Sequence, residues 1–313
     1  MENNFKLLQP RNFSQIISDT FAFLKINFRA VALPVALLVV PFLVVYAVFF
    51  TNTITTFLAS AFSGGNPFTN TDWLVKQSSH GLLYTLALIL GTTFLYLVIM
   101  ESFIAYENSE TGVLTSADIF KGVKKDFWRL VAFFFAIILL FIPLCFLFGI
   151  LIGVGIVAKA GPLMAIIGFI FAIALIYVVV PISFSPFIFI RERTGVLEAI
   201  RKSFVLIKGF WWQTLGIIIV IDLIMAFAAY ALQIPTLIVL SAQGLHSNGD
   251  FSSFQFNPLY LIFNTIGSTG SILLRSIGYM AIILQYYNLL ERKEGVDVMK
   301  QIEDISAPES PQV

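Results

Sequence analysis

Two ionisable side chains lie deep within predicted apolar helices near the C-terminal end of the chain. Asp222 follows Trp212 by about 15 Å of helix, and Arg275 precedes Tyr287 by about 18 Å. The two helices would run antiparallel, so both distances are counted from the same membrane surface. The two charges are therefore expected at similar depths. An unpaired charge at the centre of a membrane helix costs about 2.5–3.5 kcal/mol, so we expect Asp222 and Arg275 to pair. The pair would either hold the two helices together or serve as a proton or ligand site.

Small side chains near both charges favour an inward orientation. Gly267, Ser271 and Gly278 share a helical stripe with Arg275, and Ala226, Ala229 and Gln233 share one with Asp222. Small residues let membrane helices approach closely, so both charges are expected to face the bundle interior. A third ionisable residue, Glu101, lies near the end of an earlier apolar run and is expected to reach water at the membrane interface.

Clusters of basic residues accompany three short amphipathic stripes. The apolar positions are Phe13, Ile17, Phe21, Leu24 and Phe28 in the first stripe, Leu114, Ala117, Phe120, Val123 and Phe127 in the second, and Leu197, Ile200, Phe204, Ile207 and Trp211 in the third. The basic flanks are Lys121, Lys124 and Lys125 in the second stripe and Arg201, Lys202 and Lys208 in the third. Such stripes are typical of helices lying in the membrane surface. Their basic residues would either only orient the protein or bind anionic lipid headgroups, at about 1 kcal/mol each.

Residues that support common catalytic chemistry are scarce. The sequence contains two histidines, His80 and His246, both in predicted outer connections, and one cysteine, Cys145, inside an apolar run. That is too few ligands for a zinc or multi-histidine iron site. Neither a Walker-type phosphate loop nor a Gly-x-Ser-x-Gly elbow is present. We therefore expect no catalytic residue, no metal and no cofactor.

The elements that must position these residues are membrane helices. The chain has 313 residues, of which 58% are hydrophobic and 12% charged, whereas soluble proteins have about 25% charged residues. Six apolar runs come close to or exceed the roughly 20 residues needed to cross a bilayer as a helix. They are Ala30–Phe50, Gly81–Tyr106, Leu130–Ala158, Pro162–Ile190, Trp212–Leu240 and Pro258–Leu290.

The distribution of lysine and arginine predicts the orientation of these helices. Sixteen of these residues lie in the N-terminal arm, the second and fourth connections and the C-terminal tail, whereas the other connections hold only Lys76 and Lys159. Short cytoplasmic connections carry such an excess. We expect both termini in the cytoplasm, in a bacterial inner membrane, with residues 296–313 as a short cytoplasmic tail.

A spaced motif predicts an internal repeat. Gly112-Val113-Leu114 precedes Phe127-Trp128 by the same distance as Gly195-Val196-Leu197 precedes Phe210-Trp211, and a looser copy runs from Phe13 to Phe28-Arg29. The glycines are expected to take left-handed backbone angles where one helix ends. The predicted fold is all-α, a single membrane domain over 1–295. It would consist of three parallel repeats, about 10–111, 112–194 and 195–295, each an interfacial helix followed by two spans.

Two segments carry a family resemblance. The segments Leu8 to Phe21 and Pro186 to Phe204, the latter continued by Lys208-Gly209-Phe210-Trp211, resemble the membrane domain found in front of some glycerophosphoryl diester phosphodiesterases. The resemblance implies a six-helix membrane module. The catalytic domain of that family has no counterpart in this sequence, so the resemblance implies no catalytic residue.

The function expected from these observations is non-enzymatic. The cytoplasmic amphipathic helices would organise membrane lipids, including anionic ones, or a membrane protein partner, and no nucleic acid partner is expected. The alternative is a small transporter or channel that uses the region of Asp222 and Arg275. A lipid-modifying enzyme is a third hypothesis, which no motif supports.

Overall fold

The computed structural model describes residues 5–62, 71–109, 112–157, 161–246 and 258–295, and these residues contain helices and no strand. Six of the helical stretches are long and apolar enough to cross a membrane, as expected for an all-α membrane protein. In chain order the elements are α1 (Phe13–Pro34), a π-helical turn η1 (Val35–Val39), α2 (Val40–Phe62), α3 (Thr71–Glu107), α4 (Ser116–Val157), α5 (Gly161–Ile182), α6 (Ser185–Arg191), α7 (Val196–Ile207), α8 (Trp211–His246) and α9 (Pro258–Glu294).

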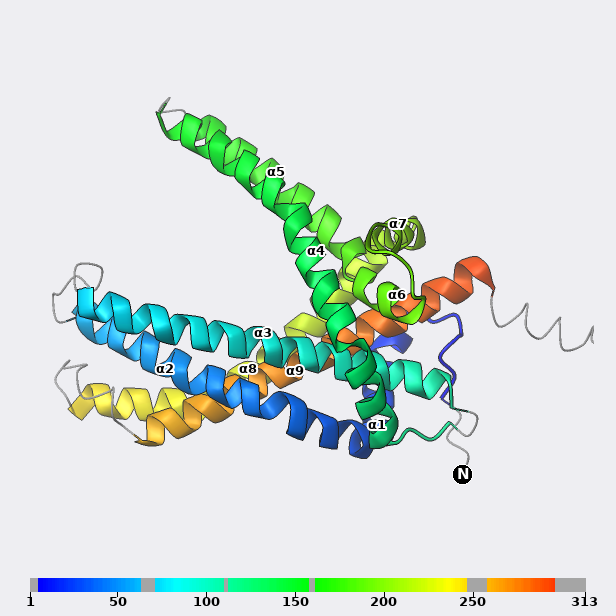
Figure 1. Ribbon diagram of the computed structural model, residues 1–313, viewed down its shortest axis with the longest axis horizontal. Helices are drawn as coiled ribbons and strands as arrows, with labels where there is room; N and C mark the ends of the chain where they lie inside the picture. The colour runs from blue at the N-terminus through cyan, green and yellow to red at the C-terminus, as the bar shows by residue number, and fades with distance from the viewer. Residues whose placement is uncertain (1–4, 63–70, 110–111, 158–160, 247–257, 296–313) are drawn as a thin grey trace, which may run out of the picture.

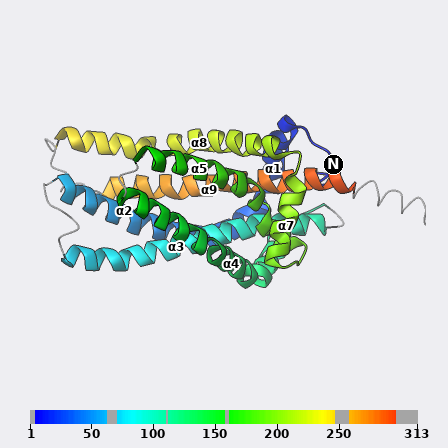
Figure 2. The ribbon, with the colours of Figure 1, turned by 90° about the horizontal axis from the view of Figure 1, so that it is seen from above.

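Four of the long helices form a bundle. Figures 1 and 2 show α2, α3, α8 and α9 running side by side, with α8 packed along α9 and α2 packed along both α3 and α9. The N-terminal segment, α6, α7 and the C-terminal end of α9 gather at one end of this bundle (Figure 1). We call it the basic end, because the ion pairs of Arg11, Arg191, Arg193 and Lys202 lie there.

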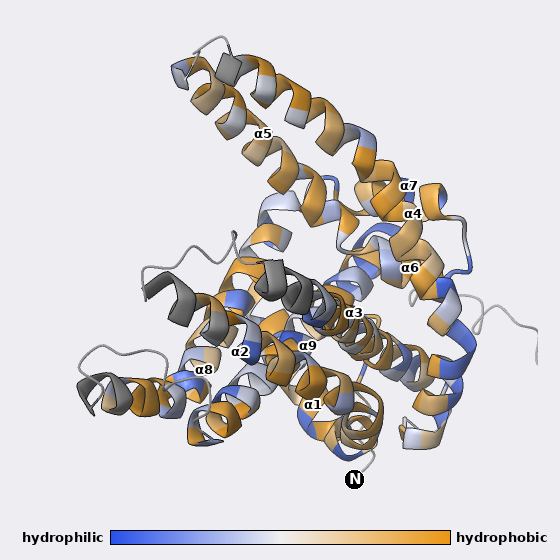
Figure 3. Cartoon of the chain, turned by 60° about the vertical axis from the view of Figure 1, so that its left-hand side comes forward, coloured by the Kyte–Doolittle hydropathy of each residue, from blue (hydrophilic) through white to orange (hydrophobic). Residues whose placement is uncertain are grey.

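The hairpin of α4 and α5 leaves the bundle near the basic end and projects away from it (Figure 1). Its two helices meet near their far ends, where the rings of Phe148 and Phe171 stack with centroids 3.8 Å apart. Apolar residues cover most of the hairpin (Figure 3), and large side chains such as Phe146 and Phe169 are about 70% exposed. In a membrane protein such a surface contacts lipid or another membrane protein.

Close packing is concentrated at the basic end. A single buried cluster joins side chains of α1, α3, α4, α6, α7, α8 and α9. It includes the fully buried rings of Phe103, Phe187, Tyr286 and Tyr287. Because interiors packed in this way fix side-chain positions, the basic end is the part of the molecule best able to hold a defined site.

Prolines mark two of the breaks in the long helices. Pro34 is followed by η1, and the helix changes direction there. As a result α1 lies across the bundle, whereas α2 runs along it (Figures 1 and 2). Pro181 lies one residue before the end of α5, and Pro186 occupies the first turn of α6, where its missing N–H costs nothing. The predicted span Pro162–Ile190 is therefore two helices, α5 and α6.

Two helices extend beyond the predicted apolar runs, so the predicted placement of His80 and His246 in connections is wrong. Helix α3 begins at Thr71, ten residues before the predicted Gly81, so His80 is helical and its ring packs edge-on against Phe49 at 5.4 Å. His246 is likewise the last residue of α8 rather than part of a connection. Polar residues near the ends of these apolar runs did not stop the helices, because backbone hydrogen bonding continues where tertiary packing supports it.

The predicted glycine breaks hold at two of three places. Gly112 and Gly295 have φ of 64° and 56°, whereas in the other copy the left-handed residue is Arg193, with φ of 59°, and Gly195 caps α7 in an extended conformation. Of the second and third amphipathic segments, only the third, α7, is a helix separate from the span that follows it. The second segment forms the first turns of α4. The threefold repeat and the interfacial position of these segments stay predictions. The expected tail, 296–313, lies outside the described residues.

Candidate functional site

Asp222 and Arg275 do not form the predicted ion pair. Both side chains are exposed at the surface of the helices, and they line one hollow of about 190 Å³ with Gly278 and Tyr279. Within the described residues, no contact of 4.0 Å or less joins the two charges. The prediction that they face the bundle interior is wrong.

The packing of α8 on α9 explains this difference. A Cβ added to Gly267 would lie 2.9 Å from Gln233 Oε1, and one added to Gly270 would lie 2.8 Å from Leu232 Cδ1. The two helices therefore approach closely at small residues, as predicted, but nearer the start of α9 than Arg275. At the level of Asp222 the hollow lies between them.

This hollow lies beside the root of the hairpin of α4 and α5. Tyr279, which lines it, packs on Tyr96 with ring centroids 4.6 Å apart. Tyr96 in turn contacts Phe134 of α4 at 6.4 Å and donates a hydrogen bond to the Ser183 carbonyl, between α5 and α6, at 3.3 Å. Arg275 lies one helical turn before Tyr279 on α9, so the hollow lies close to the point where the hairpin leaves the bundle.

An ion-pair network at the basic end joins three helices. The Arg191 guanidinium at the end of α6 binds both carboxylate oxygens of Glu107 at the end of α3, at 2.8 and 2.5 Å. Tyr287 of α9 donates to Glu107 at 2.7 Å, and Tyr286 of α9 accepts from Arg191 at 2.7 Å and donates to Glu192 at 2.6 Å. Two-point binding by an arginine fixes distance and orientation together, so this network locks the ends of α3, α6 and α9.

A second set of contacts ties the start of α4 to the segment between α6 and α7. Arg193 binds both carboxylate oxygens of Asp126, one of them at 2.7 Å. Arg129 donates to the carbonyl oxygens of Phe189 and Thr194 at 3.2 and 3.0 Å, and its guanidinium lies 4.5 Å from the centre of the Phe189 ring. These bonds fix the start of α4 against α6 and the segment that follows it.

A cleft of about 380 Å³ opens where the end of α3 meets the first turns of α4. It is lined by Glu101, Ile104, Ala105, Asn108, Ser109, Asp118, Lys121, Gly122, Lys125, Asp126 and Arg193. Glu101 is 4% exposed and its Oε1 is buried without a hydrogen-bond partner. Lys121 and Lys125 are exposed and lie one helical turn apart on α4. The cleft therefore has a buried carboxylate in its lining and two ammonium groups at its surface.

Glu101 was expected to reach water at the membrane interface, but the structure buries it. Its side chain is buried against α4, where a Cβ on Gly122 would lie 2.0 Å from Glu101 Oε2. Asp126, the nearest other carboxylate, is 1% exposed and bound by Arg193. Asp126 is bound by Arg193, whereas Glu101 Oε1 accepts no hydrogen bond from the described residues.

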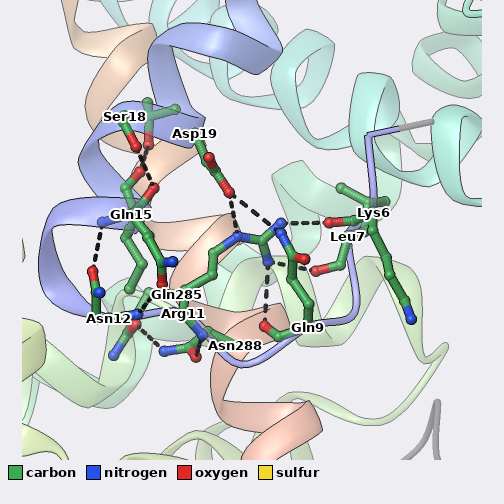
Figure 4. A network of polar contacts seen from close by, with 12 residues as sticks. Lys6, Leu7, Gln9, Arg11, Asn12, Gln15, Ser18, Asp19, Gln285 and Asn288 are labelled. Atoms are coloured by element: carbon green, nitrogen blue, oxygen red, sulfur yellow. Dashed lines mark hydrogen bonds and ion pairs between the residues drawn. The ribbon is translucent and has the colours of Figure 1, made fainter. Parts of the chain in front are cut away.

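The N-terminal segment is clamped to α9 by a third network (Figure 4). The Arg11 side chain is 1% exposed, binds Asp19 at 2.8 Å and donates to the carbonyl oxygens of Lys6 and Leu7. Its peptide N–H donates to Asn288 at 2.7 Å. Burial lowers the pKa of Arg11, and the charge and hydrogen bond of Asp19 oppose that shift. The Arg11 guanidinium is thus bonded to groups of the chain itself, and we assign this network to structure.

The predicted interfacial basic residues fall into two groups. Lys202 is occupied, because it forms ion pairs with Glu192 at 2.9 Å and Glu294 at 3.7 Å. The others, Lys121, Lys124, Lys125, Arg201 and Lys208, are exposed. Of these, only Lys121 and Lys125 line the cleft beside Glu101.

Arg191 and Arg193 were counted among the basic residues that orient the helices, and no role was expected for Glu107 and Asp126. The sequence shows two arginines, two residues apart, directly after an apolar run, which is the one feature that could have indicated ion pairs there. It did not identify their partners, which lie far away in sequence. Among the described residues, no group of His, Cys, Asp and Glu is arranged to hold a metal ion.

No protein-family profile matches the chain, and no curated protein or solved structure does either. The cleft beside Glu101 and the hollow beside Asp222 are therefore judged on their own chemistry. The cleft can bind a phosphate at Lys121 and Lys125 and a cation at Glu101. The hollow can receive a polar group at membrane depth.

Proposed function

We propose that this is a non-enzymatic integral membrane protein that holds phospholipid headgroups at the cytoplasmic face of a bacterial inner membrane. The observation that carries the proposal is the cleft between α3 and α4, in which Lys121 and Lys125 are exposed above a buried carboxylate. Ammonium groups attract lipid phosphates, with about 1 kcal/mol for each residue near the surface.

Aromatic side chains at the same end support a position at the membrane surface. Trp128, one turn beyond Lys124 on α4, is 76% exposed, and Trp212 at the start of α8 is 79% exposed. Tryptophan is enriched at the level of lipid headgroups. On α7, Leu197 and Val205 are exposed while Ala199 and Leu206 are buried, which fits a helix with one face on the protein and another on lipid.

The cytoplasmic placement of this end rests on the positive-inside rule, which assigns both termini to the cytoplasm. Three parallel repeats would place the same surface element there three times. The resemblance to the membrane domain of the phosphodiesterase family fits a membrane module of this kind and remains part of the proposal. The largely exposed hairpin of α4 and α5 also offers a surface to a membrane protein partner.

The test is the amount of lipid that purifies with the protein. In native lipid particles washed with mild detergent, the Lys121→Gln/Lys125→Gln variant is expected to retain fewer phospholipids than wild type. The matched control is Lys25→Gln/Arg29→Gln, because these exposed residues of α1 have the same spacing and remove the same charge but lie outside the cleft. Equal retention in all three proteins would refute the proposal.

A transporter or channel is the second candidate, favoured by one observation. Asp222 and Arg275 are exposed within membrane-spanning helices and share a hollow without pairing. Ionisable residues at that depth often mark pathways for ions or polar substrates. Proton- or ion-dependent flux in liposomes that is lost in Asp222→Asn would support this function, and the absence of any flux would refute it.

A further inference from the structure

The distribution of charge in the cleft between α3 and α4 selects among phospholipid headgroups. Lys121 and Lys125 supply two ammonium groups at the opening, and Glu101 supplies a buried carboxylate in the lining. Asp126 is bound by Arg193, and Asp118 accepts a hydrogen bond from Thr115 at 2.5 Å. Glu101 is therefore the carboxylate of this lining with a buried oxygen that has no partner.

A buried carboxylate oxygen without a partner is costly, and a bound donor would remove that cost. The Glu101 side chain cannot relax toward α4, because its Oε2 already lies where a Cβ on Gly122 would be, within 2.0 Å. A ligand that completes the site must hence bring a hydrogen-bond donor, and a cationic donor binds a carboxylate most strongly.

At the opening of the cleft the two lysines require an anionic group of the ligand. Two exposed lysines one turn apart can bind a single phosphate between them. A ligand that satisfies both ends has a phosphate and, a short distance away, a cation with N–H donors. An anionic headgroup that ends in hydroxyls has no cation for Glu101, and a trimethylammonium group has no N–H.

We propose that the cleft binds a phosphoethanolamine group, with its phosphate between Lys121 and Lys125 and its primary ammonium donating to Glu101. This inference rests on the proposed function and adds the headgroup class and the role of Glu101. The group could be supplied by a lipid headgroup or by a soluble phosphoethanolamine, and the experiment below distinguishes them.

The first measurement uses the wild-type protein alone. Native mass spectrometry of the detergent-solubilised protein is titrated with phosphatidylethanolamine, its mono- and dimethyl derivatives, phosphatidylcholine and phosphatidylglycerol. Affinity is expected to fall along the methylation series as N–H donors are lost, by about tenfold from the primary amine to phosphatidylcholine. Equal affinity for all five lipids would overturn the inference.

The second measurement assigns the preference to Glu101. Glu101→Gln is expected to lower affinity for phosphatidylethanolamine about tenfold while binding phosphatidylglycerol as before. Glu198→Gln, which neutralises an exposed carboxylate on α7, is expected to behave as wild type. A preference unchanged in Glu101→Gln would overturn the role of Glu101, whereas the effect of Lys121→Gln/Lys125→Gln on total lipid judges the proposed function separately.

Competition with soluble O-phosphoethanolamine identifies the source of the group. Displacement of bound lipid at millimolar concentrations would assign recognition to the headgroup and admit a soluble ligand. Failure to displace lipid, with the methylation trend intact, would assign the site to a membrane lipid whose chains also contribute. Either result, with that trend, supports a phosphoethanolamine site.

Discussion

The carboxylate of Glu101 in α3 lies directly against the backbone of Gly122 in α4, so close that a Cβ at Gly122 would be 2.0 Å from Glu101 Oε2. This contact brings the two helices together at the floor of the cleft. A larger residue at position 122 would force the buried Glu101 side chain to move.

Gly122→Ala is therefore expected to destabilise the protein by about 1–3 kcal/mol, the usual cost of overpacking. Gly149→Ala on the same helix is the control, since nothing lies within 4 Å of its added Cβ, and it should be neutral or stabilising. Thermal unfolding in detergent measures both. The double variant Glu101→Ala/Gly122→Ala should recover part of the loss, and no recovery would contradict the contact.

The Arg191–Glu107 pair is expected to contribute strongly to stability. Arg191→Ala removes a two-point ion pair with Glu107 and the hydrogen bond that Arg191 donates to Tyr286, at a cost of about 3 kcal/mol. Arg191→Lys should recover only part of this, because lysine cannot bind both oxygens in the same geometry. Arg201→Ala, at an exposed site, is the control and should change unfolding by less than about 0.5 kcal/mol. An equally small effect of Arg191→Ala would refute this role.

Asp222 and Arg275 are expected to act independently of each other in folding. Since no ion pair joins them, the effects of Asp222→Asn and Arg275→Gln on unfolding should add within about 0.5 kcal/mol in a double-mutant cycle. The charge exchange Asp222→Arg/Arg275→Asp should likewise fail to restore stability lost in the single variants. A coupling clearly larger than this value, or restoration by the exchange, would show that the two residues pair in the membrane.

The predicted topology is tested with reporter fusions. A reporter active only outside the cytoplasm should be silent when fused after Val313 and active when inserted within 247–257, in the connection between α8 and α9. The reason is the excess of lysine and arginine at the other end of the helices. Activity after Val313 would reverse the orientation and place the cleft on the opposite side of the membrane.

Much of the fold could be predicted from the sequence, because the length of an apolar run is enough to identify a membrane helix. The start of α4 could also be predicted, since Thr115 caps it by accepting from the Asp118 N–H at 3.3 Å. Helix ends were less predictable. The run Pro162–Ile190 was predicted as one span, whereas the chain forms two helices there, α5 and α6.

The candidate site could be predicted only in part. Glu101, Lys121 and Lys125 were named as candidates, but their approach depends on how α3 and α4 are rotated about their axes, and periodicity does not determine that rotation. For the same reason Asp222 was placed facing inward. Its depth follows from helical rise, whereas its direction depends on contacts at Gly267 and Gly270. The partners of Arg191 and Arg193 come from distant segments.

The central claim is that a phospholipid occupies the cleft between α3 and α4, and site-specific photo-crosslinking tests it most directly. A photoreactive amino acid is placed at Asn108, an exposed residue of the cleft lining, or at Lys25 as the control position. After irradiation in native membranes, we expect a phospholipid adduct at position 108 that is reduced in the Lys121→Gln/Lys125→Gln background. A lipid adduct equally strong at both positions, or none at position 108, would contradict the claim.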